Sequence, residues 1–364
     1  MKISEIIRYL EEEAPLGYQE SYDNSGLLVG QANMELSQAL LCLDVTEEVV
    51  EEAIQRGCNL IIAHHPLIFN GLKRLNGNTF VERCIIKAVQ NNLAIYAIHT
   101  NLDNVATGVN QKLGEVLGLK NLRILRPLKH TLRKLVVFCP ESHAVDLRFS
   151  LFEAGAGGIG NYDQCSFNVS GMGTFRATDQ ASPFVGKKGE LHYENEVRIE
   201  LIYPVPAQNA ILNAMFAKHP YEEVAYTIYS IENSNQSVGS GMVGELEVEM
   251  EEADFLQKLK NQLGTGLIRH TKLTGKNVRR VAICGGSGSF LLKDAIQAEA
   301  DFFVTADYKY HDFFDAENRI VIADVGHYES EKFTKELLRD FLMKKIRTFA
   351  PLLSNINTNP VNYY

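Results

Sequence analysis

The first third of the chain alternates short apolar runs with amphipathic stretches. Continuous apolar runs at Ala39–Leu43, Leu60–Ala63 and Leu93–Ile98 are typical of strands that are buried on both faces. Between them, Thr46 opens a predicted helix with acidic residues in its first turns, and a second helix is predicted at about 80–91. This strand–helix–strand rhythm predicts an α/β fold with a mainly parallel sheet.

The rhythm changes after about Pro127. Between residues 128 and 240 the predicted order is strand, helix, strand, strand, helix, strand, which is the order of the ferredoxin-like split unit. The polar stretch Asn233–Ser237 is a predicted linker, and the α/β rhythm resumes after it. We therefore expect residues 1–127 and 241–364 to form one two-part α/β unit, with residues 128–240 as an inserted βαββαβ domain.

Histidines and carboxylates follow three of the predicted strands. A histidine pair comes directly after Leu60–Ala63, an aspartate lies shortly after Leu93–Ile98, and a histidine with a glutamate four positions later follows Ile320–Ala323. Because open α/β sheets bind ligands outside the carboxyl ends of their strands, these side chains are expected to meet at one edge. A single histidine at a strand end is usually a capping or surface residue, so the joint pattern carries the prediction of a metal site. The candidate ligands are His64, His65, Asp103, His327 and Glu331.

The types and the number of these candidate ligands indicate which metal they would hold. His327 and Glu331 lie four positions apart, so both face the same side of a helix. Mixed imidazole and carboxylate ligands suit zinc, iron or manganese better than calcium. A catalytic zinc normally takes three ligands from the protein, so five ligands fit two divalent ions that share a carboxylate. Either Asp103 or Glu331 is expected to bridge the two ions.

Two further histidines and one glycine-rich turn are open to more than one interpretation. His99 and His311 follow predicted strands on the same sheet edge. Each is a candidate for a direct ligand, for a structural residue or for a catalytic group that carries a proton. The turn Gly285–Ser289 lies between a strand and a helix, where backbone N–H groups can cradle an anion. A tight strand-to-helix turn explains the same glycines equally well.

Composition narrows the class of protein. The chain has 364 residues, 45% apolar residues and a net charge of -9, which fits two or three globular domains and makes nucleic acid an unfavourable partner. The N-terminal residues lack the pattern of a signal peptide, and no apolar run approaches the length of a membrane span. The six cysteines are scattered, as expected of buried thiols in a reducing compartment. We therefore expect a cytoplasmic protein with no membrane partner.

Five motifs together resemble the Nif-three-like family, whose members commonly carry the name GTP cyclohydrolase 1 type 2 homologue. They match in order over residues 1–127 and 240–364, with one departure, since Tyr22 stands where the family typically has Trp. The insert is similar to the PII and CutA regulatory fold of the longer bacterial members, through Phe152–Gly157 and His219–Glu223. The five motifs are Ser21–Gly30, Ala63–Pro66, His99–Asp103, Cys284–Gly288 and Gly326–Glu331.

The resemblance implies a dinuclear metal site at the five candidate ligands and a ring-shaped homohexamer with the sites facing an internal cavity. The family name implies a metal-dependent hydrolase on a nucleotide or related small molecule, in its specific form opening the imidazole ring of GTP at C8. The alternative is a non-catalytic ring for metal storage, metal delivery or regulation, with a ligand-sensing PII-like insert. Both interpretations predict the same metal site. An open coordination position with a substrate pocket beside it would distinguish the enzyme.

Overall fold

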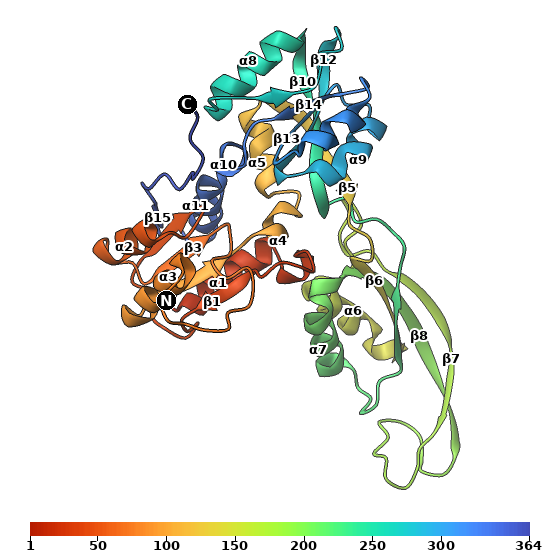
Figure 1. Ribbon diagram of the computed structural model, residues 1–364. Helices are drawn as coiled ribbons and strands as arrows, with labels where there is room; N and C mark the ends of the chain where they lie inside the picture. The colour runs from red at the N-terminus through yellow and green to blue at the C-terminus, as the bar shows by residue number, and fades with distance from the viewer. The chain divides into compact units, whose positions relative to one another are not determined.

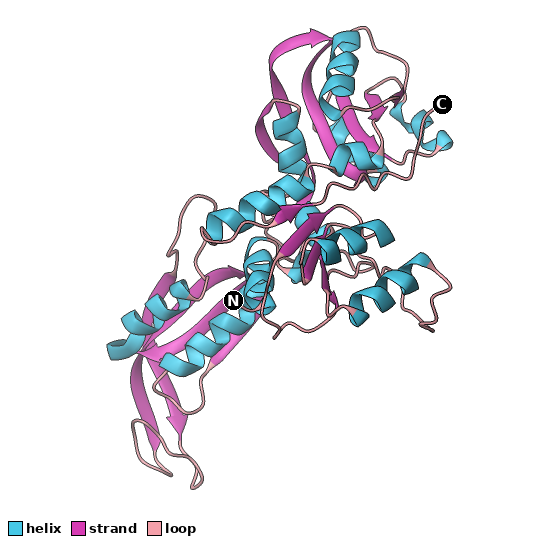
Figure 2. Ribbon diagram, turned by 90° about the vertical axis from the view of Figure 1, so that its left-hand side faces the viewer, coloured by secondary structure: helices cyan, strands magenta, loops and turns pink.

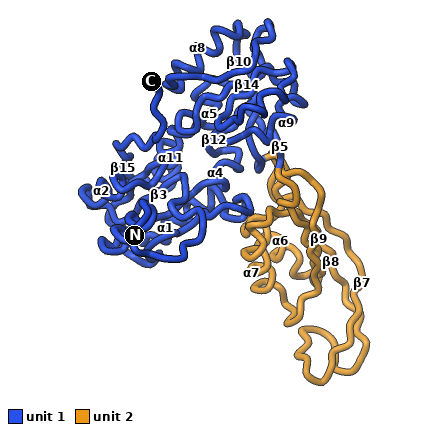
Figure 3. Tube along the Cα trace, viewed as in Figure 1, with its two compact units in different colours: residues 1–127, 237–364 blue, residues 128–236 orange.

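The computed structural model describes residues 1–364, and the chain divides into two compact units. Residues 1–127 and 237–364 form the first unit, and residues 128–236 form the second, as Figure 3 shows in blue and orange. The chain returns to the first unit at Ser237, slightly before the expected position 241, because the residues around Gly239 already pair with the strand that ends at Pro127. Each unit has its own hydrophobic core.

The first sheet of the first unit has five strands and is mainly parallel, as the apolar runs predict. Three central strands have every residue buried and end at the edge that carries the histidines. Only the edge strand β1 runs antiparallel to its neighbour. In sheet order the strands are β1 (Gly26–Val29), β4 (Ala94–Ala97), β3 (Leu60–Ala63), β2 (Ala39–Cys42) and β15 (Leu352–Leu353).

Helices cover both faces of this first sheet. Helices α2 (Glu47–Gln55) and α3 (Phe80–Gln90) pack with Leu40, Ile61 and Ile95 into one core. On the sheet's other face, α11 (Thr334–Lys345) contacts β2 and also α1 (Ile3–Glu13), as Figure 1 shows. The first turn of α2 forms as predicted, because the Thr46 hydroxyl accepts a hydrogen bond from the Val49 N–H.

The second sheet of the first unit has six strands and is mixed, which differs from the expected mainly parallel sheet. Only β12, β13 and β14 run parallel to one another. The strand that leaves for the second unit and the strand that returns from it are antiparallel neighbours, so the insertion itself adds antiparallel pairing. In sheet order the strands are β11 (Arg269–His270), β14 (Val321–Asp324), β13 (Phe302–Ala306), β12 (Asn277–Ser287), β10 (Gly239–Glu251) and β5 (Leu119–Pro127).

Helices also cover the second sheet and its carboxyl edge. Helices α5 (Val109–Val116) and α8 (Glu252–Leu263) cover one face, and α9 (Leu292–Gln297) covers the other. Two shorter helices, α4 (Thr100–Asp103) and α10 (His327–Glu331), follow β4 and β14 directly. The sequence predicts one helix from Ser330 to Lys345, whereas the structure divides this region into α10 and α11. The 3-10 helices are Leu16–Tyr18, Glu141–His143, Val205–Ala207, Ser289–Leu291 and Tyr310–Ala316.

The second unit is a four-stranded antiparallel sheet with two helices on one face (Figure 2, helices cyan and strands magenta). Helices α6 (Ala144–Glu153) and α7 (Gln208–Lys218) contact each other and share a core with the central strands. Along the chain the elements follow the order βαββαβ. In sheet order the strands are β7 (Phe167–Arg176), β8 (Leu191–Pro204), β6 (Leu132–Pro140) and β9 (Tyr226–Ser230).

Two expectations from composition are met in the fold. All six cysteines are free thiols, and all except Cys165 are buried. No helix of the chain combines the length and the apolar character that crossing a membrane requires.

Candidate metal centre

The pair His64 and Asp103, which follow β3 and β4, brings two buried atoms face to face. The His64 ring is fully buried, and its Nδ1 donates a hydrogen bond of 2.8 Å to the carbonyl oxygen of Ile98. Because a carbonyl oxygen only accepts, Nδ1 carries the proton and Nε2 keeps a free lone pair. Nε2 lies 3.6 Å from Asp103 Oδ1, and both atoms are buried without a hydrogen-bond partner. Two electron-rich atoms facing each other in this way are unfavourable unless a cation lies between them.

A second group of ligand atoms forms around Glu331, which is buried at the end of α10. Its Oε2 lies 2.9 Å from His65 Nε2 and 3.0 Å from His327 Nε2, while its Oε1 lies 3.9 Å from His64 Nε2. The glutamate therefore belongs to two groups of three possible ligands, one with His64 and Asp103 and one with His65 and His327.

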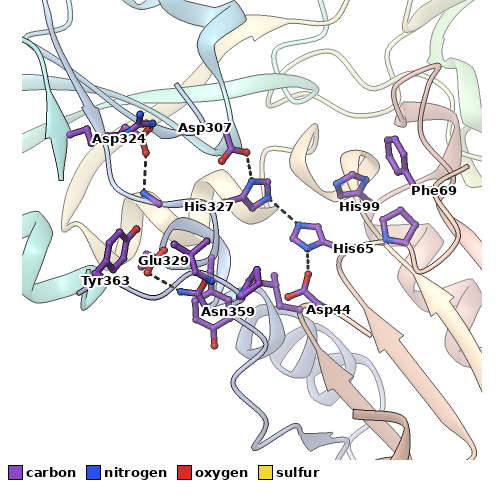
Figure 4. Close-up of a pocket in the computed structure, with 17 residues that line it drawn as sticks. Asp44, His65, Phe69, His99, Asp307, Asp324, His327, Glu329, Asn359 and Tyr363 are labelled. Carbon is purple, nitrogen blue, oxygen red and sulfur yellow. Dashed lines mark hydrogen bonds and ion pairs between the residues drawn. The ribbon is translucent and has the colours of Figure 1, made fainter. Parts of the chain in front are cut away.

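Each remaining histidine is held from behind by a carboxylate. His65 Nδ1 lies 2.7 Å from Asp44 Oδ1, and His327 Nδ1 lies 2.7 Å from Asp307 Oδ2 (Figure 4). A carboxylate behind the imidazole fixes the tautomer and the ring orientation, so that Nε2 points to the front. Asp44 was not among the site residues predicted from the sequence. Its place in the sequence could have indicated this role, because Asp44 follows the strand β2 at the same sheet edge as the histidines.

His99 joins the cluster in the same way. Its Nδ1 lies 2.8 Å from Asp23 Oδ1, and its ring centroid lies 5.3 Å from that of His64 and 5.4 Å from that of His65. Burial would raise the pKa of Asp23, but hydrogen bonds from His99 and Thr100 outweigh it and hold the pKa well below its usual range. Asp23 is therefore a permanent carboxylate that fixes His99.

Glycines let the second sheet approach the cluster closely. Gly286 has a φ of +60°, and a Cβ on it would lie 2.4 Å from Glu331 Oε1. The amide of Gly286 donates to Ser330 Oγ and that of Gly285 to Asn110 Oδ1, so these two N–H groups are already used. The turn therefore makes room for Glu331, which favours the interpretation of these glycines as a tight strand-to-helix turn. The amides of Gly285 and Gly286 do not cradle an anion.

The charges of the cluster are strongly coupled. Burial alone would lower the pKa of His65, but the Asp44 and Glu331 carboxylates raise it to about 9. Burial would likewise lower the pKa of His327, but the charge of Glu331 and the hydrogen bond that His327 donates to Asp307 raise it to about 11. Burial and the nearby Glu331 raise the pKa of Asp103 to about 7. Protons thus occupy places in this cluster that a divalent cation would take by displacing them.

A cavity of about 700 Å³ opens beside the cluster, and His65, His99 and His327 form part of its lining (Figure 4). A smaller cavity of about 220 Å³ lies against Asp103 and Glu331. The cluster is therefore accessible to a small molecule from the larger cavity. Cavities of a few hundred cubic ångströms are usual for small-molecule sites.

The structure brings together all five candidate ligands and His99, and it leaves His311 outside. His311 lies in the 3-10 helix Tyr310–Ala316, is exposed, and contacts the rings of Tyr310 and Phe314. It lines neither of the two cavities at the cluster.

Fold and site together define a mixed α/β protein with a histidine–carboxylate cluster whose donors suit a metal ion. The family model described as Duf34/NIF3 (NGG1p interacting factor 3) matches residues 1–360, and the chain belongs to this family. The family expected from the sequence motifs is thereby confirmed.

The chain is similar over its whole length to several known proteins. It is 37% identical to the GTP cyclohydrolase 1 type 2 homolog of Halalkalibacterium halodurans, covering 98% of both chains. It is 39% identical to the protein of the same name from Bacillus subtilis, covering 91% of this chain and 89% of that protein. Among solved structures, a Bacillus cereus protein related to NIF3 matches with a TM-score of 0.88 and 39% identity, covering 100% of this chain and 99% of that one. A Staphylococcus aureus protein, SA1388, matches with a TM-score of 0.79 and 32% identity over the same shares.

Proposed function

We propose that this chain binds two divalent metal ions and uses them to hydrolyse a nucleotide or a related small molecule. One ion would be held by His64, Asp103 and Glu331, and the other by His65, His327 and Glu331. The observation that carries the proposal is the pair of buried, unpartnered atoms His64 Nε2 and Asp103 Oδ1, 3.6 Å apart. Their mutual repulsion, and the lost solvation of both, are relieved by a cation between them.

The ligand count supports catalysis over storage. Each group of three ligands that includes Glu331 offers one atom from each residue. Three protein ligands are typical of catalytic zinc sites, which keep a position open, whereas structural sites are closed by four. The cavity of about 700 Å³ lies on the side where His65 and His327 are accessible. An open position beside a pocket is the feature that separates the enzyme from a binding protein.

A pair of divalent ions supplies an activated water near neutral pH and stabilises negative charge on the attacked group. The chain's own contribution to proton movement falls to His99. Its Nδ1 is hydrogen-bonded to Asp23, so Nε2 is the atom that accepts a proton in one step of the reaction and returns it in a later step. We assign this role to His99 and not to His311, because only His99 lines the cavity.

The names of the relatives suggest a substrate. Proteins that are 34–39% identical carry the name GTP cyclohydrolase 1 type 2 homolog. In this form of the proposal, water adds at C8 of the purine and the imidazole ring opens. The metal ions are zinc, iron or manganese, the metals that mixed imidazole and carboxylate ligands suit.

One observation favours the alternative, a non-catalytic ring for metal storage, metal delivery or regulation. The larger cavity is lined by four carboxylates beyond the ligands, and Arg269 is the only lysine or arginine in its lining. Such walls do not favour a triphosphate, although they accept a metal ion or a less charged molecule. The carboxylates are Asp44, Asp307, Asp324 and Glu329.

The family resemblance extends the proposal to assembly and to the inserted unit. We propose a homohexameric ring, which light scattering on the purified protein would test against a monomer or a dimer. We also propose that residues 128–236 form a PII- or CutA-like regulatory domain, a role that fits the βαββαβ order and the strand order β7-β8-β6-β9.

Turnover of a metabolite library tests the enzyme against the binding protein. Wild type and His64→Ala are each loaded with zinc, iron or manganese, and consumption of each compound is followed. The hydrolase predicts at least one compound, with GTP among those tested, that only wild type consumes. If wild type consumes nothing faster than the variant under any metal, the non-catalytic ring replaces the enzyme.

A further inference from the structure

The C-terminal part of the chain, residues 352–363, runs onto the first sheet and reaches the metal centre. Strand β15 pairs in parallel with β2, and the Ser354 N–H then donates to the carbonyl oxygen of Leu41 at 2.9 Å. The Ser354 hydroxyl and the Asn355 N–H both donate to the carboxylate of Glu52 on α2. The segment is therefore anchored on the first sheet before it reaches the cluster.

Thr358 closes a chain of hydrogen bonds that ends on a candidate ligand. Its hydroxyl donates to Asp44 Oδ2 at 2.5 Å, and Asp44 Oδ1 lies 2.7 Å from His65 Nδ1. Each carboxylate oxygen of Asp44 thus has one partner, which fixes the rotation of the carboxylate about its Cβ–Cγ bond. Without the Thr358 hydroxyl, one oxygen loses its partner and the carboxylate is free to turn away from the imidazole.

The next residue contacts the other half of the centre. Asn359 Nδ2 donates to Glu329 Oε1 at 3.1 Å, and Glu329 lies on α10 between His327 and Glu331. Two adjacent residues therefore hold one partner from each half of the cluster, Asp44 from the first sheet and Glu329 from the helix that follows the second. Figure 4 shows Asn359 beside Glu329, and Asp44 beside His65.

The same segment forms a wall of the larger cavity. Asn359, Pro360, Val361 and Tyr363 belong to its lining, together with His65 and His327. The segment thus touches the groups behind the candidate ligands and also faces the space in front of them.

We propose that Thr358 and Asn359 are positioning residues of the metal centre. Thr358 orients His65 through Asp44, and Asn359 holds α10 in place through Glu329. The inference rests on the proposed function for the presence of the metal ions. It predicts that the strength and the geometry of metal binding depend on two side chains that touch neither ion.

The test compares metal binding by wild type, Thr358→Val, Thr358→Ser and Asn359→Ala, with Asn362→Ala as the control. Asn362 lies in the same segment, is exposed, and takes no part in these contacts. Zinc affinity is measured by competition with a chelator, and the visible spectrum of the cobalt(II)-loaded protein reports the ligand geometry. Removing a group behind a metal ligand typically weakens binding by about 10–100-fold, and one step further back we expect about 3–10-fold for Thr358→Val.

The expected result is weaker zinc binding and an altered cobalt spectrum in Thr358→Val, both restored in Thr358→Ser, with Asn362→Ala like wild type. Asn359→Ala should also weaken binding, which keeps the test decisive if Thr358→Val fails to fold. If wild type binds zinc and the Thr358→Val and Asn359→Ala variants match it in affinity and spectrum, this inference is overturned and the proposed function stands. If wild type binds no metal, both fail together.

Discussion

The two halves of the metal centre are built differently. His64 and His65 stand at the end of a parallel strand whose four residues are all buried, and the His64 side chain is itself 0% exposed. His327 instead begins a five-residue helix after Gly326, and its side chain is 39% exposed. The histidines of the first half are therefore fixed by the core of their sheet, whereas the histidine of the second half is partly open to solvent. We expect the first half to determine whether metal binds, and the second to adjust how tightly it binds.

Glu331 belongs to both groups of ligands, so its replacement should have the largest effect. Glu331→Gln keeps the shape of the side chain but loses the charge and the second strong acceptor, and both ions should be lost. Elemental analysis of tag-free protein should fall from about two transition metals per chain to below about one. Glu249→Gln, at an exposed position of β10 that takes no part in the cluster, is the matched control and should keep both ions.

The buried half should respond more strongly than the exposed half when one ligand is removed. In His64→Ala, the buried Oδ1 of Asp103 loses its facing nitrogen, and we expect metal content to fall further than in His327→Ala. Both are measured by elemental analysis after the same purification. Equal losses in the two variants would contradict the difference between the halves, and metal below one equivalent in wild type and His64→Ala alike would contradict the site.

The carboxylates behind the histidines allow a finer comparison. Asp44→Asn and Asp307→Asn each weaken the hydrogen bond to one Nδ1, and zinc affinity should fall by about 10–100-fold. The side chain of Asp44 is 33% exposed and that of Asp307 is 52% exposed, so water replaces Asp307 more easily. Chelator competition should therefore show the larger loss for Asp44→Asn. The reverse order would mean that α10, and not the strand end, controls the affinity.

The pH dependence of the metal-free protein follows from the raised pKa values of His65, about 9, and His327, about 11. A histidine whose folded pKa is raised stabilises the fold fully below its unfolded pKa of about 6.5, and this is lost as pH rises through the folded pKa. Thermal unfolding of the metal-free protein should thus show stability falling above about pH 6.5, by on the order of 3 kcal/mol from His65.

Metal binding should have the opposite pH dependence, because a cation displaces the protons of the cluster. The increase in unfolding temperature caused by zinc should grow between about pH 6.5 and 9. In His65→Ala both dependences should flatten, since one of the titrating groups is gone. A zinc effect that is the same at both pH values would show that the histidines are not protonated in the metal-free protein.

Removing the second unit should have the smallest effect on the metal centre. Residues 128–236 have a core of their own, and Gly239 pairs with Pro127, so a short Gly/Ser linker can join the ends that remain. We expect the shortened protein to bind two ions with an affinity close to that of wild type. Loss of folded protein would show that the inserted unit is integral to the fold of the first.

The comparison also explains what could be predicted from the sequence. Strands β2, β3 and β4 are continuous apolar runs, so the first sheet and the ligands at its edge were predictable from local pattern. The second sheet was expected to be mainly parallel and is mixed, because β10 pairs antiparallel with β12, and β11 pairs antiparallel with β14. The third antiparallel pair, β5 with β10, forms across the inserted unit. Pairing across so long an interruption leaves no local signal.

The same reasoning applies to individual residues of the site. The apolar runs of the sequence predicted that His99 and His311 lie at one sheet edge. His311 instead lies in an exposed 3-10 helix, which the apolar run before it did not indicate. Asp44 and Thr358 are separated by 314 positions, so their contact has no sequence signature. Composition could not decide whether the C-terminal residues were docked. The structure docks them through Ser354 and Thr358.

The most direct test of the account is anomalous scattering from a crystal of the protein grown with zinc, measured on both sides of the zinc absorption edge. We predict two peaks per chain, one beside His64 and Asp103 and one beside His65 and His327, each about 2.0–2.2 Å from its ligand atoms, with Glu331 between them. Peaks at other residues, or no peak at these five, would contradict the proposed metal centre.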